Sequence, residues 1–341
     1  MTSDLGRIKI LGSVPHVTAN FAPIWLARDL GYTEEEGLDV VIELAGSPKD
    51  AVEGVIAGRG DMSFVNIVFS FLAYDRGVPY CPFYAFVRRQ NRSFSVPEAS
   101  PIWTLSDLRG RMIGLHYDDP ELRAFARAAL VGAGLDPDRD VTFKPLAGSP
   151  LDAPRMAAAI RDGEVEAVWQ LDVLSGLMAG EGLPLRRLPA PAIDGLTPSS
   201  CLEAMASALD RRPEAFGAIG RAIAKATLFA IANPAAAVRT LWRHHLDAGP
   251  QPGEDPEHAF RRELAALEVR LASQHIEGAL DPRWGAITEA ESSAWQEFLL
   301  ASEAIATRRP PSIYYSNALV ETFNAFDPRP VMADARVWLD K

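Results

Sequence analysis

The sequence has few cysteines. Cys81 and Cys201 are the two present among 341 residues, and they stand far apart without the paired spacing of zinc sites or redox motifs. This spacing argues against a cysteine-based metal or redox centre. We therefore interpret both residues as buried thiols.

Long hydrophobic runs and an excess of basic residues are also missing. The apolar segments at residues 67–73 and 222–232 fall well short of the roughly 20 residues that span a bilayer, so we expect no transmembrane helix. Lys and Arg number 34 against 45 Asp and Glu, a net charge of −11. This acidic balance opposes nonspecific attraction to nucleic acid or anionic lipid, and we expect neither as a partner.

The short motifs of several enzyme classes are absent from the sequence. It contains no glycine-rich phosphate loop, nucleophile elbow, zinc motif or kinase signature. Residues 1–7 lack the basic, apolar and small-residue succession of an export signal. We expect either a cytoplasmic protein, or a periplasmic or cell-envelope protein whose signal was removed or left out of the sequence.

The order of segments that are present indicates two similar lobes. The length suits two domains of ordinary size, and strand-like and helix-like segments alternate as in an α/β fold with mainly parallel sheets. The order strand, loop, helix, strand, Gly-Ser-Pro, helix occurs twice, with Gly46-Ser47-Pro48 and then Gly148-Ser149-Pro150. We predict lobe I at residues 1–92 plus 203–341, with a helical tail, and lobe II at 93–202. Two chain crossings would form a hinge.

A basic stretch lies at the first predicted crossing. Arg88-Arg89-Gln90-Asn91-Arg92 is followed by a segment with prolines at positions 97 and 101, which is typical of a connection between lobes. We interpret the stretch as a solvated connector rather than an anion-binding patch.

Several segments resemble a known family. They are 22–32 (APIWLARDLGY), 35–40 (EEGLDV), 57–62 (AGRGDM), 105–110 (LSDLRG), 163–169 (GEVEAVW) and 212–216 (RPEAF), followed by Asn233-Pro234. Together they resemble the sulfonate, nitrate and taurine solute-binding proteins of ABC transporters. That superfamily also contains the thiamine pyrimidine synthases. The resemblance spans most of the chain and implies a type II periplasmic-binding-protein fold with a ligand cleft between its lobes.

The resemblance also implies where a ligand would be held. In this fold the ligand lies at the carboxyl ends of strands and at helix N-termini. The candidate ligand-binding residues are therefore Ser13, His16, Thr18, Ser47, Asn66, Tyr117, Asp118, Trp169 and Asp172. Structural roles stay open beside this one, with Ser47 and Asn66 as helix caps, Trp169 in core packing and His16 exposed or structural.

Two other functions stay open. The first is thiamine pyrimidine synthase activity. The resemblance implies that this activity would require a Lys that holds pyridoxal phosphate, and a His near it, in the segment of this chain that follows Asp61. Residues 62–70 (MSFVNIVFS) contain neither a Lys nor a His. Other enzymes of the superfamily remove carboxylate or sulfinate groups from aromatic acids with a Cys or His. Neither Cys81 nor Cys201 has an evident activating base in the sequence. A cytoplasmic ligand sensor is the third alternative.

We therefore expect a solute-binding protein that closes on one small organic ligand and delivers it to an ABC importer. We predict no catalytic residue, no metal and no cofactor, and a monomer. The predicted lining contains acids and aromatic rings but no Arg or Lys. We therefore expect a flat, neutral or amine-bearing ligand, such as a heteroaromatic molecule, stacked on Trp169 or Tyr117.

Overall fold

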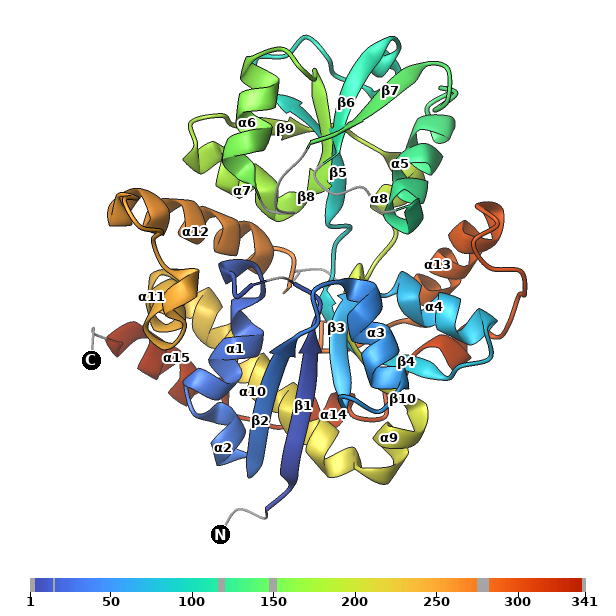
Figure 1. The fold of residues 1–341 in the computed structure, drawn as a ribbon. Helices are drawn as coiled ribbons and strands as arrows, with labels where there is room; N and C mark the ends of the chain where they lie inside the picture. The colour runs from blue at the N-terminus through green and yellow to red at the C-terminus, as the bar shows by residue number, and fades with distance from the viewer. Residues whose placement is uncertain (1–3, 15, 116–119, 147–151, 275–281, 339–341) are drawn as a thin grey trace. The chain divides into compact units, whose positions relative to one another are not determined.

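The computed structural model describes residues 4–14, 16–115, 120–146, 152–274 and 282–338, and its contacts divide the chain into two compact units. Unit 1 contains residues 1–88, 197–253 and 271–341, and unit 2 contains residues 89–196 and 254–270. Each unit holds a five-stranded sheet flanked by helices (Figure 1). The predicted two-lobed α/β class is confirmed, and both sheets are mixed, with parallel and antiparallel pairs of strands.

Unit 1 is built on five strands in the order β2-β1-β3-β10-β4. The strands are β1 (Gly6–Gly12), β2 (Leu38–Leu44), β3 (Met62–Asn66), β4 (Tyr80–Val87) and β10 (Ser200–Met205). Its α-helices in the described ranges are α1 (Ala22–Asp29), α2 (Tyr32–Glu35), α3 (Pro48–Ile56), α4 (Val68–Asp75), α9 (Ala206–Arg211), α10 (Pro213–Ala232), α11 (Pro234–His244), α13 (Glu289–Ala301), α14 (Val320–Asn324) and α15 (Pro328–Val337).

Unit 2 repeats the same strand pattern, in the order β7-β6-β8-β5-β9. The strands are β5 (Arg92–Pro97), β6 (Arg111–Leu115), β7 (Val141–Pro145), β8 (Ala167–Leu171) and β9 (Leu185–Arg187). Its α-helices in the described ranges are α5 (Pro120–Gly132), α6 (Ala153–Arg161), α7 (Asp172–Gly180), α8 (Pro191–Asp194) and α12 (Pro256–Leu271). In each sheet one strand runs antiparallel between two others, β10 in unit 1 and β5 in unit 2.

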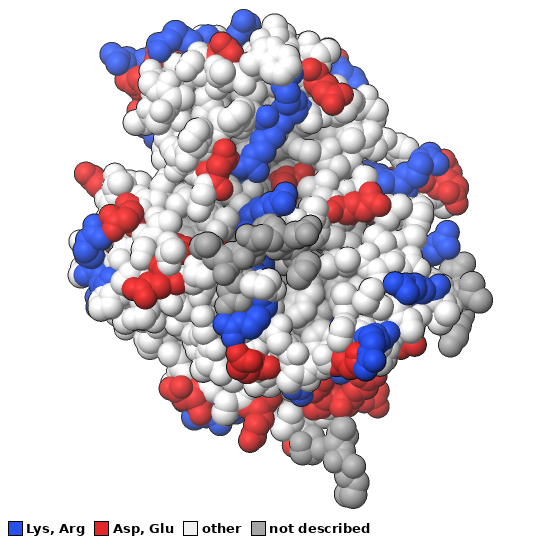
Figure 2. Space-filling view, turned by 180° about the vertical axis from the view of Figure 1, so that it is seen from behind, with Lys and Arg blue, Asp and Glu red and all other residues white. Residues whose placement is uncertain are grey.

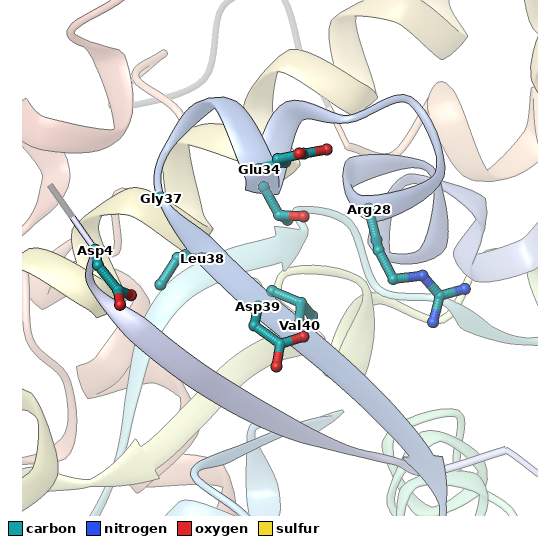
Figure 3. Close-up of a pocket in the computed structure, with 8 residues that line it drawn as sticks. Asp4, Arg28, Glu34, Gly37, Leu38, Asp39 and Val40 are labelled. Atoms are coloured by element: carbon teal, nitrogen blue, oxygen red, sulfur yellow. The ribbon is translucent and has the colours of Figure 1, made fainter. Parts of the chain in front are cut away.

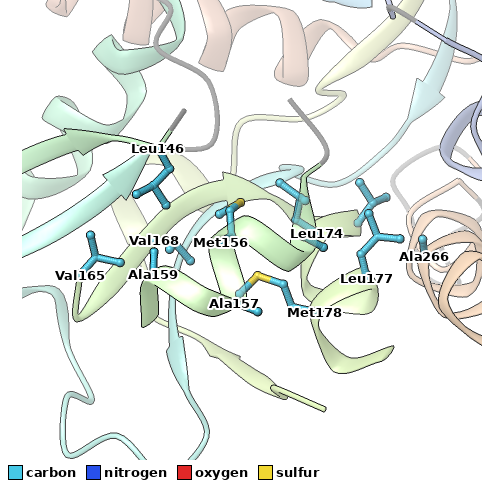
Figure 4. Packing of buried hydrophobic residues seen from close by; sticks show 12 residues of the cluster. Leu146, Met156, Ala157, Ala159, Val165, Val168, Leu174, Leu177, Met178 and Ala266 are labelled. Atoms are coloured by element: carbon cyan, nitrogen blue, oxygen red, sulfur yellow. The ribbon is translucent and has the colours of Figure 1, made fainter. Parts of the chain in front are cut away.

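The second segment of unit 2 is the helix α12. Its Ala266 belongs to a buried apolar cluster with residues of α6, β8 and α7, such as Met156, Val168 and Leu174 (Figure 4). At Gly176 of α7 a Cβ atom would lie 2.7 Å from the backbone oxygen of Ala265, so α12 approaches α7 too closely for any larger residue.

The sequence placed this helix in the wrong lobe. Residues 254–270 lie inside the range predicted for lobe I, but their contacts are those of unit 2. The chain therefore passes between the units near residues 88 and 196, a few residues before each of the two predicted crossings, and passes twice more near residues 253 and 270. The helical pattern of residues 254–270 does not indicate which of the two sheets the helix packs against.

One helix of unit 1 is long and apolar enough, by length and composition, to cross a membrane. It is α10, and 72% of its most apolar window is buried inside the protein. The helix packs against α1, α11, α14 and α15. Its apolar character is therefore that of a core helix that is covered on several sides.

The charged residues lie mainly at the surface and are interspersed in sign. Figure 2 shows acidic and basic side chains scattered over one face. Several form exposed ion pairs, such as Arg127 with Asp138 and Arg329 with Asp327. Pairs of this kind contribute little to stability because water screens them.

One carboxyl group lies inside the unit 1 sheet. Glu203 of β10 is fully buried between β3 and β4, and its Oε2 accepts a hydrogen bond of 2.6 Å from the Ser70 hydroxyl of α4. Its Oε1 has no hydrogen-bond partner. Burial raises the pKa of Glu203 well above its usual value, and the hydrogen bond from Ser70 only partly opposes this. The carboxyl is therefore held in its neutral form.

We predict that Glu203→Gln removes a pH dependence of stability. In the wild type the folded state keeps the proton above pH 4.5, where the unfolded chain releases it, so the free energy of unfolding falls as pH rises. The expected slope is about 1.4 kcal/mol per pH unit up to the folded pKa. Urea unfolding at about pH 6, 7.5 and 9 measures it. Equal slopes in the two proteins would contradict a neutral Glu203.

Candidate functional site

The carboxyl ends of three strands meet at one edge of the unit 1 sheet. β1 ends at Gly12, β3 at Asn66 and β4 at Val87, and the antiparallel β10 begins at Ser200 beside both Asn66 and Val87. Parallel sheets generally bind ligands at this edge, because the loops that follow the strands gather there. It is the candidate ligand-binding edge of unit 1.

Three predicted residues follow β1 at this edge. The Ser13 hydroxyl donates a hydrogen bond of 2.5 Å to the Phe64 carbonyl, which ties the loop to β3. His16 is exposed. Thr18 is 7% exposed, and its Oγ1 has no hydrogen-bond partner. Thr18 therefore offers a polar atom to a ligand, whereas Ser13 is already engaged.

The other two predicted residues of this unit act as local caps. Ser47 Oγ accepts a hydrogen bond of 3.1 Å from the Asp50 backbone N–H and donates one of 2.7 Å to the Asp50 carboxylate, at the start of α3. Asn66 is buried, and its Oδ1 accepts a hydrogen bond of 3.0 Å from the Val68 backbone N–H at the start of α4. These are the capping roles that the sequence left open, and ligand contact by either residue stays a prediction.

Two residues at the same edge were not found from the sequence. Ser199 precedes β10; its N–H donates to the Val87 carbonyl, and its fully buried Oγ has no partner. The Arg88 N–H donates a hydrogen bond of 2.7 Å to the Ser273 carbonyl. This places the next residue, Gln274, beside the end of β4. Gln274 is 2% exposed, and neither atom of its amide group has a partner.

The corresponding edge of unit 2 lies at the ends of β6 and β8 and the start of β5, where Arg92 pairs with Leu171. The predicted residues Tyr117 and Asp118 lie outside the described residues. Trp169 is 1% exposed, and its ring centroid lies 4.8 Å from that of Phe94 in the unit 2 interior. Core packing is thus its observed contact, and stacking on a ligand stays a prediction.

Asp172, the last predicted residue, is engaged in a buried ion pair. Its Oδ1 lies 2.9 Å from Nη2 of Arg270 on α12 and also accepts a hydrogen bond from the Val173 N–H. The guanidinium of Arg270 is fully buried, and the carboxyl of Asp172 is 17% exposed. Burial raises the pKa of Asp172, while the charge of Arg270 opposes the rise. Arg270 could not be found from the sequence, because it lies 98 residues from Asp172 along the chain.

The basic stretch at residues 88–92 lies where the chain passes between the units, but it is not solvated as the sequence suggested, apart from the exposed Arg89. Arg88, Gln90, Asn91 and Arg92 are all buried, and Arg92 begins β5. The Asn91 carbonyl accepts a hydrogen bond from the Asp172 N–H, and the Gln90 carbonyl accepts one from Arg187. The interpretation was wrong because polar side chains alone do not distinguish a solvated loop from a hydrogen-bonded sheet edge.

The two cysteines are buried thiols, as predicted. Burial raises the pKa of Cys81 to about 12. Burial likewise raises the pKa of Cys201 well above its usual value. Both groups are therefore protonated at neutral pH and are poor nucleophiles.

We predict that neither thiol reacts with Ellman's reagent in the folded protein at about pH 8, because the reagent needs an accessible thiolate. Two thiols per chain should become reactive in denaturant. Absorbance at 412 nm follows the reaction. Rapid stoichiometric labelling of the native wild type, lost in Cys81→Ala, would identify Cys81 as an activated thiol instead.

A surface pocket lies elsewhere in unit 1. It has a volume of about 520 Å³ and is lined by Asp4, Arg28, Thr33, Glu34, Gly37, Leu38, Asp39 and Val40 (Figure 3). These residues lie before β1, in the amino-terminal half of β2 and around α1 and α2, and none of them is a predicted ligand-binding residue. In the described ranges, no group of three or more His, Cys, Asp and Glu residues could hold a metal ion.

Solved structures with the same architecture include periplasmic binding proteins and an enzyme. The chain has a TM-score of 0.65 and 13% identity with the periplasmic aliphatic sulphonate binding protein SsuA of Escherichia coli, covering 91% of this chain and 92% of that one. With SsuA of Xanthomonas axonopodis bound to MOPS the TM-score is 0.60 at 17% identity, with 93% and 97% covered. The desulfurization enzyme DSZB gives 0.61 at 16%, with 93% and 99% covered. The chain has the periplasmic binding protein fold.

Sequence comparison then gives the family. Residues 18–237 match the family model described as NMT1/THI5 like, and the chain belongs to this family. It is 24% identical over 267 residues to 4-amino-5-hydroxymethyl-2-methylpyrimidine phosphate synthase THI13 of Saccharomyces cerevisiae, covering 74% of this chain and 75% of that protein. The synthase of Aspergillus parasiticus is 36% identical over 64 residues, so the match spans 19% of either protein. Binding proteins and enzymes thus share this fold.

We predict that Arg270→Met destabilises the protein by about 3 kcal/mol, because it leaves the Asp172 carboxylate buried without its counter-charge. The double variant Arg270→Met with Asp172→Asn should recover most of this loss. Chemical unfolding of the four proteins in a double-mutant cycle measures the coupling. Additive effects of the two substitutions would show that the pair does not stabilise the fold.

Proposed function

We propose that the chain is a solute-binding protein that takes up one small organic ligand and delivers it to an ABC importer. The proposal combines the fold, which the sulfonate-binding proteins share, with the chemistry of the unit 1 edge. The transporter, the ligand and a location in the cell envelope are all parts of this proposal.

The observation that carries the proposal is a set of buried polar atoms that lack partners. Thr18 Oγ1, Ser199 Oγ and both amide atoms of Gln274 lie near the carboxyl edge of the unit 1 sheet and make no hydrogen bond. Leaving such an atom unpaired costs about 1–3 kcal/mol. A ligand that hydrogen-bonds to these atoms would remove this cost, so the edge is suited to binding.

The same edge is poorly suited to catalysis. The buried groups there, on Thr18, Ser199 and Gln274, are hydroxyl and amide groups, which bind and orient a ligand but do not transfer protons near neutral pH without a base. His16, which follows β1 at this edge, carries an imidazole, but it is exposed rather than buried beside them. The raised pKa values of Cys81 and Cys201 disfavour thiolate chemistry. Residues 62–70 contain no Lys or His, the residues that the resemblance to thiamine pyrimidine synthases would require there. These features favour binding over turnover.

In the mechanism we propose, ligand binding shifts the protein toward a closed state. A ligand favours the closed state only by the contacts that it makes there and not in the open state. The four passages of the chain between the units are the positions at which backbone rotation would be needed. We propose a flat, neutral or amine-bearing ligand.

We predict that the purified protein releases one unaltered small organic molecule at a near-unit ratio. Native mass spectrometry, followed by denaturation and small-molecule analysis, identifies it. Adding the molecule back should raise the melting temperature in proportion to its saturation of the site. If the protein purifies empty, a ligand library read by thermal shift provides the candidate.

Recovery of a substrate together with its decarboxylated or desulfinated product would overturn the binding proposal in favour of an enzyme. Fractionation of cells that express the native gene separately tests the proposed envelope location. A protein found wholly in the cytoplasm, with its ligand bound, would support the sensor function instead.

A further inference from the structure

Gln274 differs from the other buried glutamines in the described part of the chain. Gln90, Gln170 and Gln296 are each at most 2% exposed, and each makes at least one hydrogen bond through its amide group. Gln274 is equally buried, but its Nε2 and Oε1 both lack a partner. A buried amide group without hydrogen-bond partners lowers the free energy of unfolding. We therefore look for a role of Gln274 other than stabilising the fold.

Gln274 lies beside the end of β4, at the candidate ligand-binding edge. Its own N–H donates a hydrogen bond of 3.1 Å to the Leu271 carbonyl, which closes a turn directly after α12. The preceding residue, Ser273, accepts a hydrogen bond from the Arg88 N–H at the end of β4. The Ser199 N–H binds the carbonyl of Val87, the residue before Arg88. The unpaired hydroxyl of Ser199 and the unpaired amide of Gln274 therefore flank the same strand end.

A primary amide recognises a particular pattern of ligand atoms. Its N–H group donates and its carbonyl oxygen accepts, and the two lie side by side in one plane. The complementary partner is a neutral group that presents an acceptor and a donor on one edge, as a carboxamide or a lactam does. An anion has no donor and would leave the carbonyl oxygen of Gln274 unpaired.

We propose that Gln274 is a specificity-determining ligand contact, and that the ligand carries a neutral carboxamide-like or lactam-like edge that pairs with it. This inference rests on the proposed function, since it names the ligand class of that binding edge. The unpaired Ser199 hydroxyl beside the same strand end provides a further hydrogen bond.

The first experiment compares the stability of two ligand-free variants. Gln274→Met removes two unmet polar atoms, so its melting temperature should equal or exceed the wild-type value by up to about 4 °C. Gln296→Met is the matched control, because Gln296 lies in the same unit, is similarly buried and accepts a 2.6 Å hydrogen bond from the Arg309 N–H. It should melt below the wild type. A Gln274→Met protein that loses as much stability as Gln296→Met would overturn the proposal.

The second experiment tests the ligand class with defined probes. 2-Pyridone and nicotinamide present a donor and an acceptor on one edge, while N-methyl-2-pyridone and N,N-dimethylnicotinamide lack the donor. Thermal shift and calorimetry should detect binding of at least one unmethylated probe to the wild type, and about tenfold weaker or no binding of its methylated counterpart. The shift should vanish in Gln274→Met and persist in Gln296→Met.

Three results would overturn the inference: no probe raises the melting temperature, a methylated probe binds as well as its parent, or Gln274→Met keeps the shift. The proposed binding function is tested separately from the role of Gln274. The wild type and Gln274→Met are each tested for binding of an anion such as nicotinate and of the molecule recovered by mass spectrometry. If both proteins bind one of these ligands equally well, the proposed binding function is supported and the proposed role of Gln274 is wrong.

Discussion

The insertion of β10 between β3 and β4 is the constraint on which the rest of unit 1 depends. This strand returns from unit 2, runs antiparallel to both neighbours and supplies the hydrogen bonds that join them into one sheet. Its register places Ser200 opposite Asn66 and Val87, so that Ser199 lies at the carboxyl edge where the candidate site is found. The same register carries Glu203 into the interior, where a neutral carboxyl replaces an apolar side chain. In unit 2, β5 has the equivalent place, since it runs antiparallel between β8 and β9 and joins them into one sheet.

The two candidate edges differ in their electrostatics. The unpaired polar atoms that lie near the unit 1 edge, on Thr18, Ser199 and Gln274, belong to neutral hydroxyl and amide groups, while in unit 2 the carboxyl of Asp172 pairs with Arg270. This ion pair links the start of α7 to α12, and the charges of Arg187 and Arg92 also act on Asp172. The family contains relatives named as synthases, and structures of the same fold include sulfonate-binding proteins and a desulfurization enzyme. What separates such functions is the set of side chains at these edges, since the sheets themselves are shared.

The fold was predictable from the sequence because its signals are local. Alternating strand and helix patterns reflect neighbouring residues, and Ser47 of the first Gly-Ser-Pro segment caps α3. The second Gly-Ser-Pro segment lies outside the described residues, and the helix after it, α6, is capped by Asp152. The candidate site was only partly predictable. Thr18 follows β1 closely enough to be found, but Gln274 and Arg270 come from a distant tail whose helices carry no signal for their packing. The buried stretch at residues 88–92 was misread for a related reason, because its hydrogen-bond partners Asp172 and Arg187 lie far along the chain.

The place of β10 also has a consequence for synthesis on the ribosome. Residues 1–88 emerge first, with β3 and β4 present but without the strand that joins them, so each has an unpaired edge. The strands of the second sheet, by contrast, all lie within residues 92–187 and emerge as one continuous block. The nascent chain can therefore complete its second sheet before its first. During that interval β3 and β4 expose strand edges that can pair with other chains.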